Sequence, residues 1–208
     1  MQPGQSSEKN GNPAEPLVNL SASARLSPIV ESLADRPDKT PSLINTRDRI
    51  AIFIDGASLF YAAMQLQIEI DYIRLLVFLT HGRRLLRAYF YTGSDRHNEK
   101  QQGFLLWMRR NGYRVVTKEL VQLPDGSRKA NLDVEMAIDM LMLADHCDTM
   151  VLVTGDGDLA YVVNAVTYRG VTVEVVSLRS MTSDALINVA DQFTDLAGIQ
   201  QHIQKQDS

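Results

Sequence analysis

The stretch Val151-Leu-Val-Thr-Gly-Asp-Gly-Asp-Leu-Ala160 decides the fold of this chain. Its apolar, β-branched start is typical of a strand that is buried on both faces of a parallel sheet. The glycines predict a sharp turn, and the apolar pattern beyond them predicts a helix that starts beside Asp156 and Asp158. A second segment of the same build, Ile50-Ala-Ile-Phe-Ile-Asp-Gly-Ala57, occurs upstream. If these two corners meet, they form a carboxylate site.

Strands and helices alternate along the chain on both sides of this stretch. We expect five strands, at residues 50–54, 85–91, 113–118, in the opening stretch, and at 171–176. Between them we expect helices over residues 57–67, 71–79, 96–111, 131–144, 159–169 and 183–189, and a small hairpin around Pro124-Asp125-Gly126. Such alternation predicts an α/β fold with a parallel sheet between two layers of helices.

Composition is typical of one globular domain with polar ends. The chain has 208 residues, of which 45% are hydrophobic. We expect a disordered tail over residues 1–46, the domain over 47–197 and a polar tail over 198–208. We find no apolar run long enough to span a bilayer and no secretory signal, and the single cysteine, Cys147, excludes an internal disulfide. We therefore expect a cytoplasmic protein without a membrane partner.

The first and fourth predicted strands each end in an aspartate. Ligands of doubly wound sheets bind where the strand order reverses. If the first and fourth strands are the neighbours at that reversal, Asp55 lies beside Asp156. Capping of a helix is the alternative role for Asp55, since aspartates are common at helix starts. A helix cap would explain only one of Asp156 and Asp158 and would leave the other without a role. The pair therefore favours a carboxylate site.

The segment Lys129-Ala-Asn-Leu-Asp133-Val-Glu-Met-Ala-Ile-Asp139 adds a third acidic element. We interpret Asp133, in the first turn of a helix, as a further ligand. Asp139 lies six residues later, roughly 120° around the helix. We therefore expect it to contact a metal-binding residue rather than the metal, or to be a buried structural anchor. Lys129 stands one turn before Asp133, where it balances the carboxylates or contacts a phosphate. A solvated salt bridge is its alternative role.

Carboxylates that converge repel one another unless a cation lies between them. Oxygen ligands without histidine or cysteine indicate Mg²⁺ or Mn²⁺, the ions that commonly accompany phosphates. Such ions activate water and neutralise charge on a phosphoryl group, which points to hydrolysis of phosphodiester bonds. A phosphatase with an Asp-x-Asp pair after its first strand fits poorly, because Asp55-Gly-Ala57 lacks the second aspartate.

Three ordered motifs resemble the NYN domain of the PIN-like nuclease superfamily, in its LabA-like bacterial branch. They are Phe53-Ile-Asp-Gly-Ala-Ser-Leu-Phe60, the Lys129, Asp133 and Asp139 spacing, and Thr154-Gly-Asp-Gly-Asp158. The resemblance covers about residues 49–196 and implies a PIN-like sheet of order 3-2-1-4-5 and metal-dependent RNA cleavage. It implies metal ligation by Asp55, Asp133 and Asp156, with Asp158 as a fourth acidic residue. One departure is Ser58, where the family usually has asparagine; this alters positioning of substrate or metal.

Basic residues near the predicted edge suggest contacts with RNA, which we expect to be single-stranded. The candidates are Arg96 and Lys100 after the second strand, and Arg128 and Lys129 in the hairpin. Ordinary solvated charges are the alternative interpretation of each. The net charge of −4 decides nothing, because catalytic carboxylates lower it without removing a local basic rim. A non-catalytic regulatory or scaffold protein that keeps the fold is the alternative function.

Two segments bear on protein partners. Residues 27–34 have a proline near their start and apolar residues at helical spacing, which predicts a docking segment or a weakly helical tail. The second is the methionine-rich helix that contains Met136, Met140 and Met142. We expect these methionines either to face a partner, which is a second copy or another protein, or to fill the core as methionine usually does.

Overall fold

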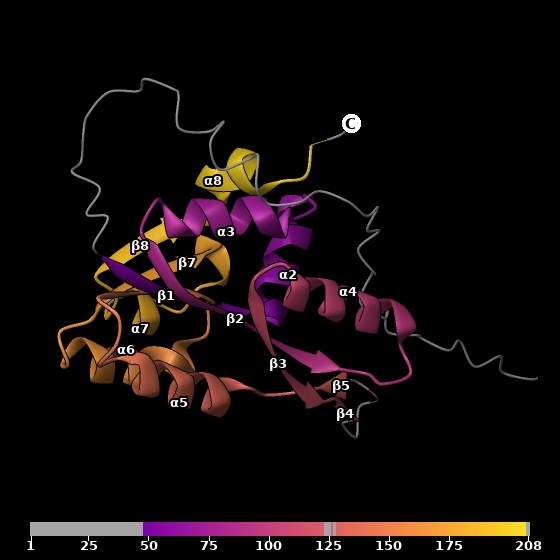
Figure 1. Ribbon diagram of the computed structural model, residues 1–208, viewed down its shortest axis with the longest axis horizontal. Coiled ribbons are helices and arrows are strands. Elements are labelled where there is room, and N and C mark those ends of the chain that lie inside the picture. Colours follow the sequence, from indigo (N-terminus) through magenta and orange to yellow (C-terminus); the bar gives the residue numbers. More distant parts are fainter. Residues whose placement is uncertain (1–47, 123–125, 127, 207–208) are drawn as a thin grey trace, which may run out of the picture.

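A parallel sheet of six strands with helices on both faces forms the centre of the protein (Figure 1). The computed structural model describes residues 48–122, 126 and 128–206. The strand order is β3-β2-β1-β6-β7-β8, and every neighbouring pair is parallel. The bounds are β1 (Arg49–Asp55), β2 (Arg84–Ser94), β3 (Tyr113–Glu119), β6 (Thr149–Val153), β7 (Thr172–Ser177) and β8 (Gln192–Asp195).

Two helical layers bury the two faces of the sheet. One layer packs on alternate strand residues such as Ile52, and contains α2 (Gly56–Leu66), α3 (Tyr72–Thr80), α4 (Glu99–Arg110) and α8 (Leu196–Ile203). The other packs on residues such as Phe53, and contains α5 (Asp133–Leu143), α6 (Ala160–Thr167) and α7 (Asp184–Ile187). Figure 1 shows the two layers above and below the sheet. Among the described helices, none has both the length and the hydropathy needed to cross a bilayer.

The predicted α/β class and the order of the five predicted strands are confirmed, but the strand count is wrong. The sixth strand, β8, pairs with β7 at the edge of the sheet. It has four residues, of which Phe193 is the only large apolar one, so it lacks the apolar run that marks a buried strand.

Two predicted helix boundaries also need correction. Residues 198–203 belong to α8 and not to a polar tail, because Asp195 caps the helix and Ile199 and Ile203 are buried with Leu196. The helix predicted from Arg96 begins at Glu99, because Asn98 is its N-cap and accepts the Gln101 N–H.

The predicted hairpin arm is present. Strands β4 (Val121–Gln122) and β5 (Arg128–Lys129) pair antiparallel between β3 and α5. The predicted disordered tail over residues 1–46 lies outside the described residues.

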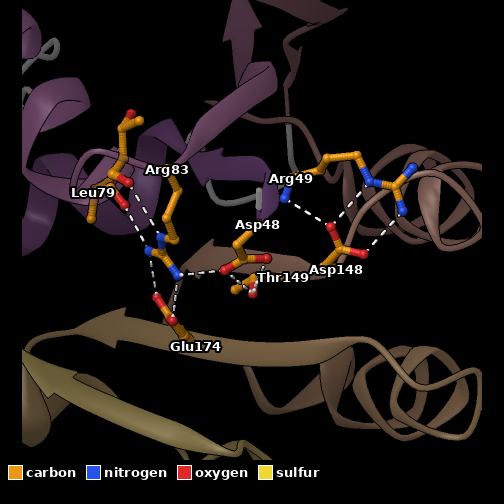
Figure 2. A network of polar contacts seen from close by, with 8 residues as sticks. Asp48, Arg49, Leu79, Arg83, Asp148, Thr149 and Glu174 are labelled. Carbon is orange, nitrogen blue, oxygen red and sulfur yellow. Dashed lines mark hydrogen bonds and ion pairs between the residues drawn. The ribbon is translucent and has the colours of Figure 1, made fainter. Parts of the chain in front are cut away.

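Paired charges hold the amino-terminal edge of the sheet together (Figure 2). Arg83 Nη1 lies 2.6 Å from Glu174 Oε1 on β7, and the same side chain donates to the Leu79 and Thr80 carbonyls at the end of α3. Its guanidinium also lies 3.9 Å from Asp48, which accepts a hydrogen bond from Thr149 on β6. The charges at this edge therefore have a structural role.

Beside this cluster, Arg49 and Asp148 form a bidentate pair with nitrogen to oxygen distances of 3.0 Å. The Arg49 backbone N–H donates to the same carboxylate. These contacts lower the pKa of Asp148 to about 2. Because the pKa is lower than in the unfolded chain, the stabilisation is present above about pH 4 and is lost as the pH falls towards 2.

We expect Arg83→Ala to lower the free energy of unfolding by about 2–4 kcal/mol, because it leaves the half-buried Glu174 carboxylate without its partner. Arg84→Ala is the matched control, since Arg84 is exposed and its truncation should change stability by less than about 0.5 kcal/mol. Urea unfolding at pH 7 measures both. Equal urea midpoints for the two variants would show that the contact between Arg83 and Glu174 does not stabilise the protein.

Candidate metal centre

The carboxyl ends of β1 and β6 lie side by side at the centre of the sheet. Ile54 on β1 pairs with Val153 on β6, so the next residues, Asp55 and Thr154, are neighbours. The chain leaves β1 towards β2 on one side and leaves β6 towards β7 on the other. The predicted reversal of strand order therefore occurs between these two strands, and it is the place where doubly wound sheets bind ligands.

Asp55 caps α2 and is also tied to β6. Its Oδ1 accepts the N–H groups of Ala57 and Ser58 at 3.0 and 3.3 Å. Its Oδ2 accepts the hydroxyls of Ser58 at 2.5 Å and Thr154 at 3.3 Å. The capping role and the site role that we weighed for Asp55 thus coexist, because backbone donors fix the carboxylate at the shared edge.

Thr154 is a positioning residue that our reading of the sequence did not single out. Its side chain is buried, and its hydroxyl donates to Asp55 while accepting the N–H of Asp156 at 3.2 Å. One hydroxyl thereby joins the two acidic corners. The signal in the sequence is a hydroxyl residue at the end of an apolar strand, directly before Gly155-Asp156.

Asp156 and Asp158 occupy the turn after β6, as predicted. Asp156 caps the 3-10 turn η1 (Gly157–Leu159), where its Oδ1 accepts the Asp158 N–H at 2.9 Å. The glycines of this turn are required by packing, since neither has a positive φ. A Cβ on Gly155 would clash with the Met181 carbonyl oxygen, and one on Gly157 would meet the Ser183 hydroxyl.

The start of α5 brings Asp133 to the same edge. Asn131 Oδ1 accepts the Asp133 N–H at 2.9 Å. Lys118 of β3 donates to the Asn131 carbonyl at 2.9 Å and to Glu135 at 2.8 Å, and so holds the beginning of the helix. Lys118 was missed as a candidate, because nothing in its spacing from Asp133 indicates this contact.

Asp133, Asp156 and Asp158 converge. One carboxylate oxygen of each lies within 4.8 Å of the others. Burial raises the pKa of Asp133, a hydrogen bond with Asn131 opposes the rise, and the carboxylates of Asp156, Asp55 and Asp158 add to it. The folded protein therefore concentrates negative charge here, and this oxygen-only donor set suits a hard divalent cation such as Mg²⁺ or Mn²⁺.

The remaining predicted residues fall into different places. Ser58 contacts Asp55 directly. Asp139 accepts the Tyr91 hydroxyl at 2.8 Å and joins α5 to β2, so of its two predicted roles the contact fits a structural anchor. Met136 and Met140 fill the core, whereas Met142 is exposed.

The proposed RNA-binding residues follow the carboxyl ends of β2 and β3 along the chain. Arg96 is exposed in the turn after β2, and Lys100 is exposed in the first turn of α4. Lys129 is exposed on β5, opposite Val121, and Arg128 is its neighbour along that strand. Their contacts with RNA stay predictions.

A parallel sheet whose central strands end in an acidic group defines a PIN-like α/β domain. A family model described as the NYN domain matches residues 49–197. The "Low amplitude and bright protein LabA" of Synechococcus elongatus is 34% identical over 165 residues, 76% of this chain and 88% of that protein. A crystal structure of a protein of unknown function from Vibrio parahaemolyticus has a TM-score of 0.67 and 27% identity, and covers 77% of this chain and 98% of its own. The chain therefore belongs to the NYN domain family, a family of predicted nucleases.

We expect Gly155→Ala to destabilise the protein by about 1–3 kcal/mol, because the added methyl group overlaps a backbone carbonyl and forces the turn to shift. Gly103→Ala is the control, since Gly103 lies in α4 with open space around it and alanine should stabilise an exposed helix by about 0.5–1 kcal/mol. Thermal unfolding measures both. Equal stability of Gly155→Ala and the wild type would show that the turn is not tightly packed.

Proposed function

We propose that the protein is a metal-dependent ribonuclease that hydrolyses phosphodiester bonds at the carboxyl edge of its sheet. The observation that carries the proposal is the convergence of Asp133, Asp156 and Asp158 within 4.8 Å. They come from two separate elements, and Asp55 approaches from a third. Family membership supports a nuclease in particular, because the matched residues 49–197 include all four aspartates.

The residues fit the ion. Asp133, Asp156 and Asp158 would hold Mg²⁺ or Mn²⁺ together, and Asp55 would contribute from the adjacent strand end. When bound, such a cation neutralises charge on a phosphoryl group and makes a water molecule a better nucleophile. The protein supplies the fixed orientation: backbone N–H groups hold Asp55 and Asp156, and the Lys118 and Asn131 contacts hold Asp133.

The substrate that we infer is single-stranded RNA. The basic candidates Arg96, Lys100, Arg128 and Lys129 would contact its backbone, which leaves the scissile phosphate at the acidic group. We infer a cytoplasmic location from the single cysteine, Cys147. A non-catalytic regulatory protein is the second candidate, favoured by one observation. Ser58, where the family usually has asparagine, is already engaged by Asp55.

We expect Asp156→Asn to reduce Mn²⁺-dependent cleavage of a labelled single-stranded RNA by at least about 100-fold. Asparagine keeps an oxygen to accept the Asp158 N–H, so the fold should persist while the charge is lost. Asp145→Asn is the control, because Asp145 is an exposed aspartate beyond the end of α5.

Cleavage by Asp156→Asn at the wild-type rate, with an unchanged circular dichroism spectrum, would overturn the proposed ribonuclease activity of this site. Calorimetric titration of the wild type with Mn²⁺ then separates the two candidates. Binding that is lost in Asp156→Asn supports the metal site, whereas no binding at millimolar Mn²⁺ supports the non-catalytic protein.

A further inference from the structure

The outward surface of α5 is apolar. Its exposed residues are Val134, Ile138 and Met142, with exposed fractions of 64%, 52% and 69%. The charged residues of the helix, Asp133, Glu135 and Asp139, are half-buried. Surface helices normally turn polar residues to the solvent, so α5 has the reverse of the usual pattern. An exposed apolar stripe of this kind marks a surface that another segment covers.

The apolar surface continues onto α6. Tyr161 and Tyr168, one at each end of α6, are 86% and 91% exposed. Arg169 donates to the Leu141 carbonyl at 3.1 Å, and Figure 1 shows α5 and α6 next to each other beneath the sheet. We call the surface formed by Val134, Ile138, Met142, Tyr161 and Tyr168 the α5–α6 face.

The size of the α5–α6 face favours a short segment over a second copy of the chain. Two adjacent helices of this length present a surface of about 16 by 20 Å, or roughly 300 Å². A twofold interface built on it would bury about 600 Å² in total, well below the roughly 1,200–2,000 Å² of a stable complex. A single amphipathic helix of about nine residues matches this surface.

The sequence before Asp48 contains such a segment. Leu26, Ile29, Val30 and Leu33 have the spacing i, i+3, i+4 and i+7, which is one face of a helix, and Pro28 suits its first turn. We propose that residues 26–34, which lie outside the described residues, dock on the α5–α6 face of the same chain. The face and the segment then bury each other's apolar side chains.

The attachment point of the segment makes this docking possible. Asp148 N–H donates to the Arg49 carbonyl at 2.8 Å, and the neighbouring Cys147 thiol contacts the Leu143 carbonyl at the end of α5. The chain therefore enters the domain beside the Met142 end of the face. Residues 35–47 reach at most about 43 Å, whereas α5 is about 16 Å long. A tether of this length gives an effective concentration of about millimolar.

Hydrogen exchange of the full chain tests the proposal. We expect the amides of residues 29–34 to exchange at least about tenfold more slowly in the wild type than in the face variant Ile138→Ser/Tyr161→Ser. Leu106→Ser is the matched control, because Leu106 is 47% exposed on α4 and its loss should leave the protection intact. The reciprocal variant Ile29→Ser/Leu33→Ser should remove the protection as well.

Three outcomes would overturn the proposal. Exchange of residues 29–34 at the unprotected rate in the wild type would show that the segment does not dock. Protection that survives Ile138→Ser/Tyr161→Ser would show that it docks elsewhere. Protection that disappears on dilution would show that a second copy provides the contact.

Discussion

Repulsion between carboxylates at the carboxyl edge of the sheet is the constraint on which the architecture depends. Three elements carry the carboxylates of Asp55, Asp133, Asp156 and Asp158. Like charges repel, so these elements would separate if the rest of the fold did not hold them. The fold holds them with hydrogen bonds to uncharged groups. Backbone N–H groups hold Asp55 and Asp156, the buried Thr154 hydroxyl joins the two strand ends, and the Asn131 side chain accepts the N–H of Asp133. Since these contacts do not cancel the charge, the edge keeps the negative charge that the proposed cation site requires.

The two edges of the sheet use charge in opposite ways. At the amino-terminal edge every charge shown in Figure 2 has a partner, because Arg83 contacts Glu174 and Asp48, and Arg49 contacts Asp148. At the carboxyl edge three carboxylates face one another. The paired charges stabilise the domain, whereas the converging carboxylates make it less stable and supply the proposed cation site. Such a division is expected where function needs a local arrangement that packing alone would not favour.

The α/β class and the acidic corners followed from local patterns, because each predicted strand is an apolar run and each corner an Asp-Gly turn. The order of the five strands came from the resemblance to the NYN domain, because no local pattern states which strands are neighbours. Other features depend on contacts between distant residues. Nothing local indicates that Lys118 holds the start of α5, 17 residues before its partner Glu135. The short edge strand β8 lacks an apolar run, and most residues of α8 after Gly198 are polar, which predicted a tail. The glycines at residues 155 and 157 were predicted for backbone freedom but are required by close packing.

The central claim is that the ends of β1 and β6 and the start of α5 share one cation. Anomalous diffraction from crystals soaked in Mn²⁺ tests it most directly, because manganese identifies its own position. We expect a peak within about 2.0–2.3 Å of carboxylate oxygens from Asp133 and Asp156, and we expect Asp156→Asn to abolish it. A manganese peak at a different carboxylate cluster, or no manganese peak at this edge of the sheet, would contradict a shared cation.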